Sequence, residues 1–250
     1  MTTSSPKGRD CTMERPCDDV RENLKRIRET MAQAAVASGR RPEDVRLLGV
    51  TKTVPPDRIN AALEAGVTMI GENRVQEFLE KRDALRLEGA AVHLIGHLQT
   101  NKVSRIVGLV DMIESVDSVR LARAVSDASV KRGLVTDVLA EVNIGREEAK
   151  SGVFAENLDE MLEEIRLFPG IRVRGLMTVP PILETEGEKR AVFSQMYKLF
   201  IDIRGKNKDN VVMDTLSMGM SGDYREAILE GATLVRVGSA LFGRRAYPAR

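Results

Sequence analysis

Short apolar runs alternate with amphipathic stretches along most of the chain. The runs are three to seven residues long and rich in Val, Ile and Leu, which is typical of buried strands. They cover residues 47–50, 67–71, 91–96, 112–116, 136–142, 173–177, 215–217 and 234–237. Because a helical pattern follows each run, the alternation predicts a parallel sheet with right-handed crossover connections.

The helical patterns indicate the size of the fold. In the first pattern, Val20, Leu24, Ile27 and Met31 recur at helical spacing from about residue 18 to residue 38, and Gly39 ends it. Further helices are predicted at 56–65, 74–87, from 98–102 up to 110, and at 117–132, 157–168, 186–204, 221–230 and 238–243. Eight strand–helix units within about 230 residues are the size of a single (β/α)8 TIM-type barrel of the α/β class, here with an extra N-terminal helix. A doubly wound open sheet is the alternative, because the pattern does not show closure.

Composition and charge narrow the class of protein. The net charge is only +1, from 38 basic and 37 acidic residues, which argues against DNA or a membrane surface as a partner. Aromatic residues make up 4% of the chain and Trp is absent, so a stacking platform for single-stranded nucleic acid is not expected. We expect one barrel at 18–246, a poorly ordered polar leader at 1–17 and a short tail at 247–250.

The sequence offers few residues for metal or thiol chemistry. Cys11 and Cys17 both lie in the polar leader, and His93 and His97 are the only histidines. This set suggests neither a disulfide framework nor a zinc site, and we expect reduced thiols in a cytoplasmic protein. His93 lies within a predicted strand and is expected to be packed, whereas His97 follows that strand and could line the mouth of the barrel.

Lys52 lies where the first predicted strand ends and a loop begins. Pro55 and Pro56 follow it, which ends strand pairing and can start a helix. In α/β proteins the carboxyl ends of the strands form the edge at which ligands bind. On this stretch alone a solvated lysine at the rim is favoured over a functional amine.

Two turns rich in glycine and serine follow the last two predicted strands. They are SMGMSGD at 217–223 and VGSA at 237–240. Amide groups at helix starts, beside small side chains, can bind phosphate, and TIM barrels often bind phosphate after strands seven and eight. For either turn alone, ordinary capping by Ser221 or Ser239 is favoured. Together, at the last two of eight units, the turns favour a phosphate site.

A lysine and a phosphate site at one mouth suggest an aldehyde cofactor such as pyridoxal 5′-phosphate (PLP). PLP binding requires a reactive amine, a phosphate site and a partner for the pyridine nitrogen. Arg236, two residues before Gly238, faces the same side of its strand and could reach that nitrogen. A structural ion pair inside the barrel is the alternative for Arg236.

The chain resembles the pyridoxal phosphate homeostasis proteins of the YggS/PROSC type, which are related in fold to the N-terminal barrel of alanine racemases. The matching segments are GVTKT at 49–53, GENRVQE at 71–77, HLIGHLQTNK at 93–102, VNIG at 142–145, KSG at 150–152, RGLM at 174–177, LSMGMS at 216–221, VRVGS at 235–239 and FG at 242–243. One departure is His97, where the family usually has proline.

The resemblance implies a role for each matching position. Lys52 is implied as the Schiff-base lysine and Arg236 as the partner of the pyridine nitrogen. The implied phosphate site consists of Ser221 with the backbone of Gly238 and Ser239. It also implies that Asn73 and Met177 contact the side of the ring.

These features predict a PLP-binding protein that acts in intracellular PLP homeostasis and delivery without robust turnover. An arginine at the pyridine nitrogen disfavours its protonation, which makes the cofactor a weaker electron sink. Racemases also use a second, β-rich domain and a tyrosine base, and we expect that domain to be absent because the chain reaches Arg250 just after the eighth unit. A free-standing amino-acid racemase and an aldolase-type barrel enzyme that uses Lys52 are the alternatives. The resemblance favours a monomer, and PLP-accepting apo-enzymes are the expected partners.

Overall fold

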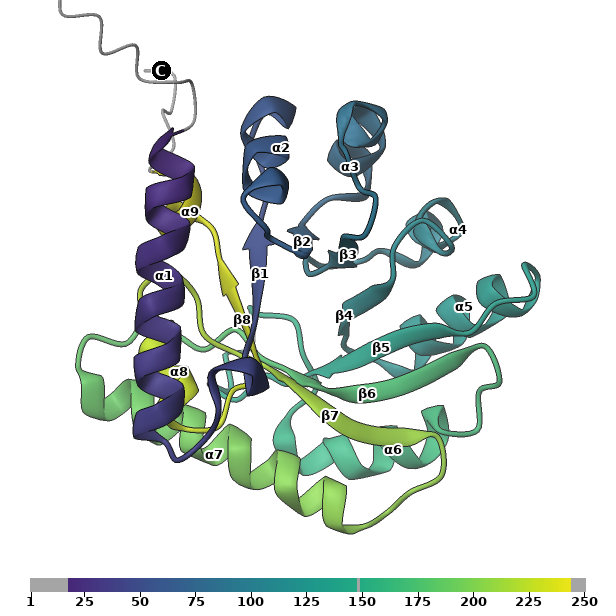
Figure 1. The fold of residues 1–250 in the computed structure, drawn as a ribbon. Helices are drawn as coiled ribbons and strands as arrows, with labels where there is room; N and C mark the ends of the chain where they lie inside the picture. The colour runs from purple at the N-terminus through teal and green to yellow at the C-terminus, as the bar shows by residue number, and fades with distance from the viewer. Residues whose placement is uncertain (1–17, 148, 244–250) are drawn as a thin grey trace, which may run out of the picture.

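The computed structural model describes residues 18–147 and 149–243. Within these residues, eight parallel strands pair in chain order and β8 pairs with β1, which closes the sheet into a barrel (Figure 1). The strands are β1 (Arg46–Val50), β2 (Met69–Glu72), β3 (Ala91–Leu94), β4 (Met112–Val116), β5 (Thr136–Glu141), β6 (Ile171–Met177), β7 (Val211–Ser217) and β8 (Leu234–Val237). The predicted barrel is therefore confirmed and the open-sheet alternative is wrong.

The helices cover the outside of this barrel (Figure 1). They are α1 (Asp18–Ala37), α2 (Pro56–Glu64), α3 (Val75–Lys81), α4 (Val103–Ile106), α5 (Val119–Val130), α6 (Leu158–Ile165), α7 (Glu186–Gly205), α8 (Tyr224–Leu229) and α9 (Ser239–Phe242), with 3-10 turns at Pro42–Asp44, Arg82–Ala84, Thr100–Lys102 and Ala155–Asn157. The predicted leader at 1–17 and tail at 247–250 lie outside the described residues, so the domain boundaries stay a prediction.

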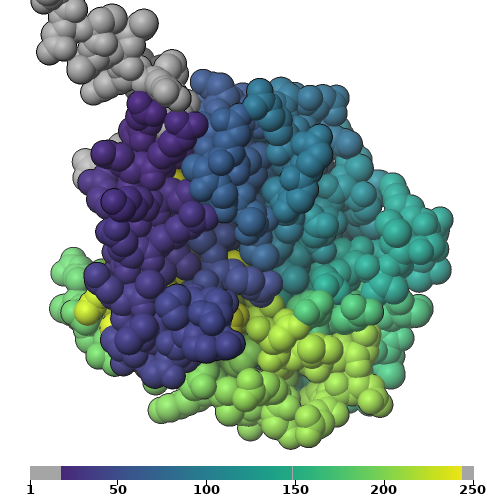
Figure 2. All heavy atoms as spheres, viewed as in Figure 1, coloured from purple at the N-terminus to yellow at the C-terminus, as the bar shows by residue number. Residues whose placement is uncertain are grey.

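The extra helix α1 lies along the side of the barrel where the first and last strands meet. Its apolar residues Val20, Leu24 and Ile27 are buried, because helical spacing places them on one face. This face contacts α8 and α9, and α1 also contacts α2, which Figure 2 shows beside it. The N-terminal helix therefore joins the two ends of the chain.

The pairing of β1 with β8 brings the start and the end of the sequence to one level of the barrel. Gly49 is the register partner of Val237. The amide of Thr51 still donates to the carbonyl of Gly71 at 2.9 Å, so pairing with the β2 side continues one residue past β1. Consequently, the segment that follows β1 and the turn that follows β8 leave the barrel side by side.

The ends of several predicted elements differ from the structure, among them those of two helices and one strand. The helix predicted at 74–87 ends at Lys81, because the Asn60 side chain donates to the carbonyl of Ala84 and accepts from the amide of Arg86, both at 2.9 Å. Strand β7 begins at Val211 rather than at residue 215, with alternating exposed and buried positions. Helix α8 begins at Tyr224 rather than at residue 221, because the backbone of Asp223 has φ −154° and is not helical.

Candidate functional site

Lys52 lies in the turn between β1 and α2, as the sequence predicts. Its side chain is half-buried. Thr53 has φ +59°, a left-handed conformation that is a genuine outlier for a β-branched residue. Helix α2 then begins with Pro56 as its first residue, a position at which the missing N–H has no consequence. The lysine is thus presented by a short and unusually bent segment at the carboxyl end of a strand.

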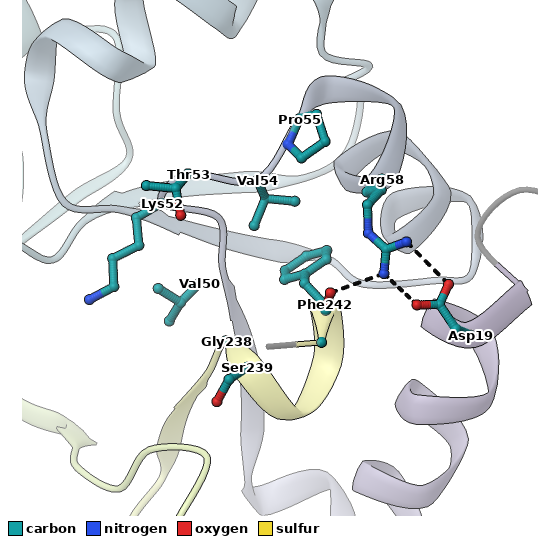
Figure 3. A pocket seen from close by; sticks show the side chains of 11 residues that line it. Asp19, Val50, Lys52, Thr53, Val54, Pro55, Arg58, Gly238, Ser239 and Phe242 are labelled. Carbon is teal, nitrogen blue, oxygen red and sulfur yellow. Dashed lines mark hydrogen bonds and ion pairs between the residues drawn. The ribbon is translucent and has the colours of Figure 1, made fainter. Parts of the chain in front are cut away.

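A pocket of about 520 Å³ opens beside this turn. It is lined by Asp19, Val50, Lys52, Thr53, Val54, Pro55, Arg58, Gly238, Ser239, Phe242 and Gly243. Figure 3 shows that Lys52 comes from the segment after β1 and that Ser239 comes from the start of α9. The predicted amine and one predicted phosphate-binding turn therefore share one cavity, although they come from opposite ends of the sequence.

Arg58 fixes the outer wall of the pocket. Its guanidinium donates to the carbonyl of Phe242 at 3.0 Å and forms an ion pair with Asp19 (Figure 3). These contacts connect α2 with α1 and with the end of α9. The pocket wall is therefore held by three helices rather than by a single loop.

The turn at 217–223 is joined to the turn at 237–240 by one hydroxyl group. The Ser221 Oγ accepts the backbone N–H of Gly238 at 3.1 Å and that of Ala240 at 3.2 Å. Ser221 does not cap its own helix, because α8 starts three residues later. A Cβ on Gly238 would lie only 3.3 Å from Val50, so a glycine lets this turn approach the end of β1 closely. The two turns thus form one unit next to the pocket.

Arg236 lies inside the barrel and is only 3% exposed. Its guanidinium donates to the Ser217 hydroxyl at 2.6 Å and to the Thr178 carbonyl at 2.7 Å. The Ser217 hydroxyl donates in turn to Glu114 at 2.6 Å. A structural ion pair was the alternative for Arg236. Arg236 and Glu114 are not in direct contact, because the Ser217 hydroxyl lies between the guanidinium and the carboxylate.

His93 extends this chain of contacts to a fourth strand. Its Nδ1 lies 2.6 Å from the second carboxylate oxygen of Glu114. Burial raises the pKa of Glu114, but the hydrogen bond with His93 and the charge of Arg236 outweigh it and hold that pKa below its ordinary value. Burial also lowers the pKa of Arg236, which nearby carboxylates oppose. We call Arg236, Ser217, Glu114 and His93 the inner network.

Asn73 and Met177 lie at the ends of two further strands. Asn73 is half-buried, and its Oδ1 atom has no hydrogen-bond partner in the described structure. Its backbone contacts Gly96 so closely that a Cβ there would lie 2.2 Å from the Asn73 carbonyl oxygen. Met177 is fully buried and clusters with Met112 and Leu139. Neither residue lines the pocket around Lys52.

The remaining polar strand ends have local roles. His97 is exposed, with Nδ1 at 3.5 Å from Asp117, while His93 is buried as predicted. The Ser115 hydroxyl donates to the Gly96 carbonyl at 2.7 Å. The Asn143 amide donates to the carbonyl of Glu147 at 2.8 Å and so closes its own loop. These residues shape the rim and do not converge on the pocket.

Residues 18–147 and 149–243 contain no group of three or more His, Cys, Asp or Glu side chains placed to hold a metal ion. No helix in this part of the chain combines the length and apolar character needed to cross a membrane.

Comparisons with known proteins agree with this architecture. The sequence description of the alanine racemase N-terminal domain family matches residues 17–246. A pyridoxal phosphate homeostasis protein of Aquifex aeolicus (strain VF5) is 44% identical over 226 residues, which cover 90% of this chain and 98% of that protein. The chain belongs to the pyridoxal phosphate homeostasis protein family.

Solved structures of similar fold include one with PLP bound. The structure of PipY from Synechococcus elongatus PCC7942 with PLP bound is similar, with a TM-score of 0.77, 31% identity, and coverage of 90% of this chain and 100% of that chain. An alanine racemase of Clostridium difficile 630 has a TM-score of 0.71 at 16% identity, with coverage of 92% of this chain and 60% of that chain, and shows likeness of fold alone.

Several buried charged residues of this family member were missed by the sequence analysis. Glu114 and Glu141 stand within apolar strand runs, and Glu72 directly follows one. All three are at most 6% exposed, and Glu141 has one carboxylate oxygen without a partner in the described structure. A carboxylate inside an apolar run is the sequence signal that could have identified Glu114 and Glu141. Lys81 gives no such signal, because a lysine near the end of a helix is ordinary.

Proposed function

We propose that the protein binds PLP as a Schiff base on Lys52 and acts in intracellular PLP homeostasis and delivery without robust turnover. The observation that carries this proposal is the shared pocket of Lys52, Gly238 and Ser239 in a chain of this family. When bound, PLP supplies an aldehyde that lysine can capture and a pyridine ring that can withdraw electrons.

The turn before α9 has the features of a phosphate site. The N–H groups of Gly238 and Ala240 converge on one oxygen atom, the Ser221 hydroxyl. Convergent amides at a helix start are the donors that phosphate oxygens require. Gly238 has no side chain to fill the space beside Val50. Ser221, Gly238 and Ser239 are therefore our proposed phosphate-binding residues.

Arg236 is our proposed partner of the pyridine nitrogen. The inner network fixes its guanidinium through Ser217 and Thr178, and a guanidinium has five N–H donors with which to serve several acceptors. A permanently charged donor at that nitrogen disfavours protonation of the ring. This arrangement supports cofactor holding over chemistry that needs a strong electron sink. Asn73 and Met177 are proposed as contacts at the side of the ring.

The positions of the tyrosines support the carrier proposal over the racemase alternative. Tyr197 lies on α7, where it contacts Gly231 and is 40% exposed, and Tyr224 is the first residue of α8. Neither of them lines the pocket beside Lys52. Tyr247 lies outside the described residues. Cytoplasmic location, a monomeric state and PLP-accepting apo-enzymes as partners belong to this proposal through the family resemblance.

A visible absorbance spectrum tests the proposal directly. We expect a band from the lysine-bound cofactor when PLP is added to the purified protein. It should be lost completely in Lys52→Ala, because Lys52 is the one lysine among the residues that line the described pocket. Lys198→Ala, which changes an exposed lysine on α7, is the matched control and should keep the band. Loss of the band in both variants, or in neither, would contradict the assignment of Lys52.

A turnover assay separates the carrier from the enzymes. The protein is incubated with PLP and L-amino acids, and D-enantiomers are measured over time. We expect no sustained production. Sustained racemisation that disappears in Lys52→Ala would reject the carrier proposal in favour of the racemase alternative. A PLP band that depends on Lys52 would exclude the aldolase-type alternative.

A further inference from the structure

A second lysine lies directly behind the turn that carries Lys52. Lys81, the last residue of α3, is only 8% exposed. Its ammonium lies 2.7 Å from the Thr51 carbonyl oxygen, 2.7 Å from Glu72 Oε1 and 3.1 Å from Glu77 Oε1. An ammonium has three N–H donors, so the three acceptors match its full capacity. Lys81 is therefore a structural cation and not a second reactive amine.

The acidic partners of Lys81 reach the same turn. Glu77 accepts the backbone N–H of Thr53 with the oxygen that also contacts Lys81. Glu72 accepts the Thr51 hydroxyl with the oxygen that contacts Lys81. The residues on both sides of Lys52 are thus hydrogen-bonded to one largely buried charge cluster of Lys81, Glu72 and Glu77.

The backbone of the turn requires such support. Thr53 holds φ +59°, and conformations of this kind persist only where the surrounding structure enforces them. Two contacts hold this conformation. The Val54 N–H donates to the Thr51 carbonyl at 3.1 Å, and the Glu77 carboxylate, which contacts Lys81, accepts the Thr53 amide. A relaxed turn would point the side chain of the preceding residue, Lys52, in another direction.

We propose that Lys81, with Glu77, is the positioning residue for Lys52, because its ammonium holds the strained turn from which the Lys52 side chain lines the pocket. This inference rests on the proposed PLP function and deepens it. The proposed phosphate-binding residues follow β7 (Ser221) and β8 (Gly238 and Ser239). They share no contact with Lys81 among those described. Amine capture and phosphate binding should therefore respond differently to the loss of Lys81.

The variant must avoid a trivial folding failure. Lys81→Met alone leaves Glu72 as a buried carboxylate without its cation, which is strongly destabilising. The double variant Lys81→Met/Glu72→Gln removes both charges and keeps similar shapes. Lys198→Met, the same change at an exposed lysine, is the matched control.

The experiment compares two ligands on each variant. PLP can react with Lys52, whereas pyridoxine 5′-phosphate carries the same phosphate but an alcohol in place of the aldehyde and can only bind. For the double variant we expect apparent PLP affinity, followed by the visible band, to fall about tenfold or more, as for a lost charge-assisted hydrogen bond. Binding of pyridoxine 5′-phosphate, measured by calorimetry, should stay within about twofold of wild type, because the phosphate-binding turn is intact.

Amide hydrogen exchange of the ligand-free proteins completes the test. The Thr53 amide should exchange at least about tenfold faster in the double variant than in wild type or the Lys198→Met control. Equal weakening for both ligands would mean a general structural effect and overturn the proposal, as would unchanged PLP affinity. If wild type shows no PLP band, the proposed function fails. Unchanged exchange at Thr53 would overturn the positioning role independently of PLP.

Discussion

Two polar clusters in the same barrel hold their arginines in different ways. Arg174 contacts Asp137 at 2.7 Å and Asp214 at 2.9 Å, and these side chains are 23% to 39% exposed. Arg236 of the inner network is 3% exposed and has the Ser217 hydroxyl between itself and Glu114. The first arginine is saturated by carboxylates and stabilises neighbouring strands. Arg236 contacts its counter-charge, Glu114, only through Ser217. A buried cation therefore lies close to the mouth of the barrel.

This difference shows how one fold separates stability from ligand binding. Direct ion pairs near solvent contribute little each and tolerate change. A fully buried cation is costly unless every group around it is satisfied, so its environment is sensitive to single substitutions. Substitutions at three positions test this contrast.

The largest effect should come from the inner network. Glu114→Ala removes the carboxylate that faces both His93 and, through Ser217, Arg236. Because the arginine charge stays buried without its counter-charge, we expect a loss of about 3–5 kcal/mol in the free energy of unfolding, measured by urea denaturation. Glu114→Gln keeps an acceptor and should cost clearly less. A loss below about 1 kcal/mol for the alanine variant would show that the network is not cooperative.

An intermediate effect, and one that depends on pH, is expected at Glu141. Burial raises its pKa, and one of its oxygen atoms has no partner in the described structure. The Glu141 carboxyl group therefore stays protonated in the folded protein at pH values where it is ionised in the unfolded chain. Its contribution to stability falls as pH rises above the ordinary pKa of glutamate. Glu141→Gln removes this loss.

The pH dependence of unfolding measures this effect. We expect the variant to match wild type in acid, below the ordinary pKa of glutamate, and to exceed it by about 1 kcal/mol at neutral pH. Ser151 donates to the other oxygen at 2.9 Å and can keep that bond in the variant. A variant that is less stable than wild type at neutral pH would mean that the carboxylate is ionised and needed.

The smallest effect is expected at the direct ion pairs. Asp137→Asn weakens one of the contacts of Arg174, while Asp214 remains. Because solvent and salt screen this pair, we expect a cost of about 0.5 kcal/mol that decreases further in high salt. The visible band with PLP should be unchanged. An altered band would mean that this cluster is coupled to the ligand pocket after all.

The sequence predicts most of the fold because strand runs and helix patterns are local signals. Runs such as 112–116 and 234–237 coincide with β4 and β8, and the barrel follows from their count and order. Strand β7 was predicted too short because Asp214 interrupts its apolar run, although Val211, Val212 and Met213 before it are apolar. The local pattern thus predicts the type of an element better than it predicts the residues at which the element begins and ends.

The candidate site was only partly predictable for a different reason. Lys52 and the turn at 237–240 stand at element ends, where local signals place them at one mouth. The inner network depends on contacts across the barrel, such as Ser217 to Glu114, which are 103 residues apart in the chain. Strand alternation tells which residues face inward but not which of them meet. The contacts of Lys81 with the turn at Lys52 were missed for the same reason.

The position of α1 has a consequence for how the chain is synthesised. Its apolar face is made first, yet its contacts on α8 and α9 are made last. On the ribosome this stripe has early neighbours such as α2, but it lacks its cover by α8 and α9 until nearly the whole polypeptide has emerged. Closure of the barrel and docking of α1 should therefore coincide in one late cooperative event, and nascent chains that stop before α8 should be the species that bind chaperones.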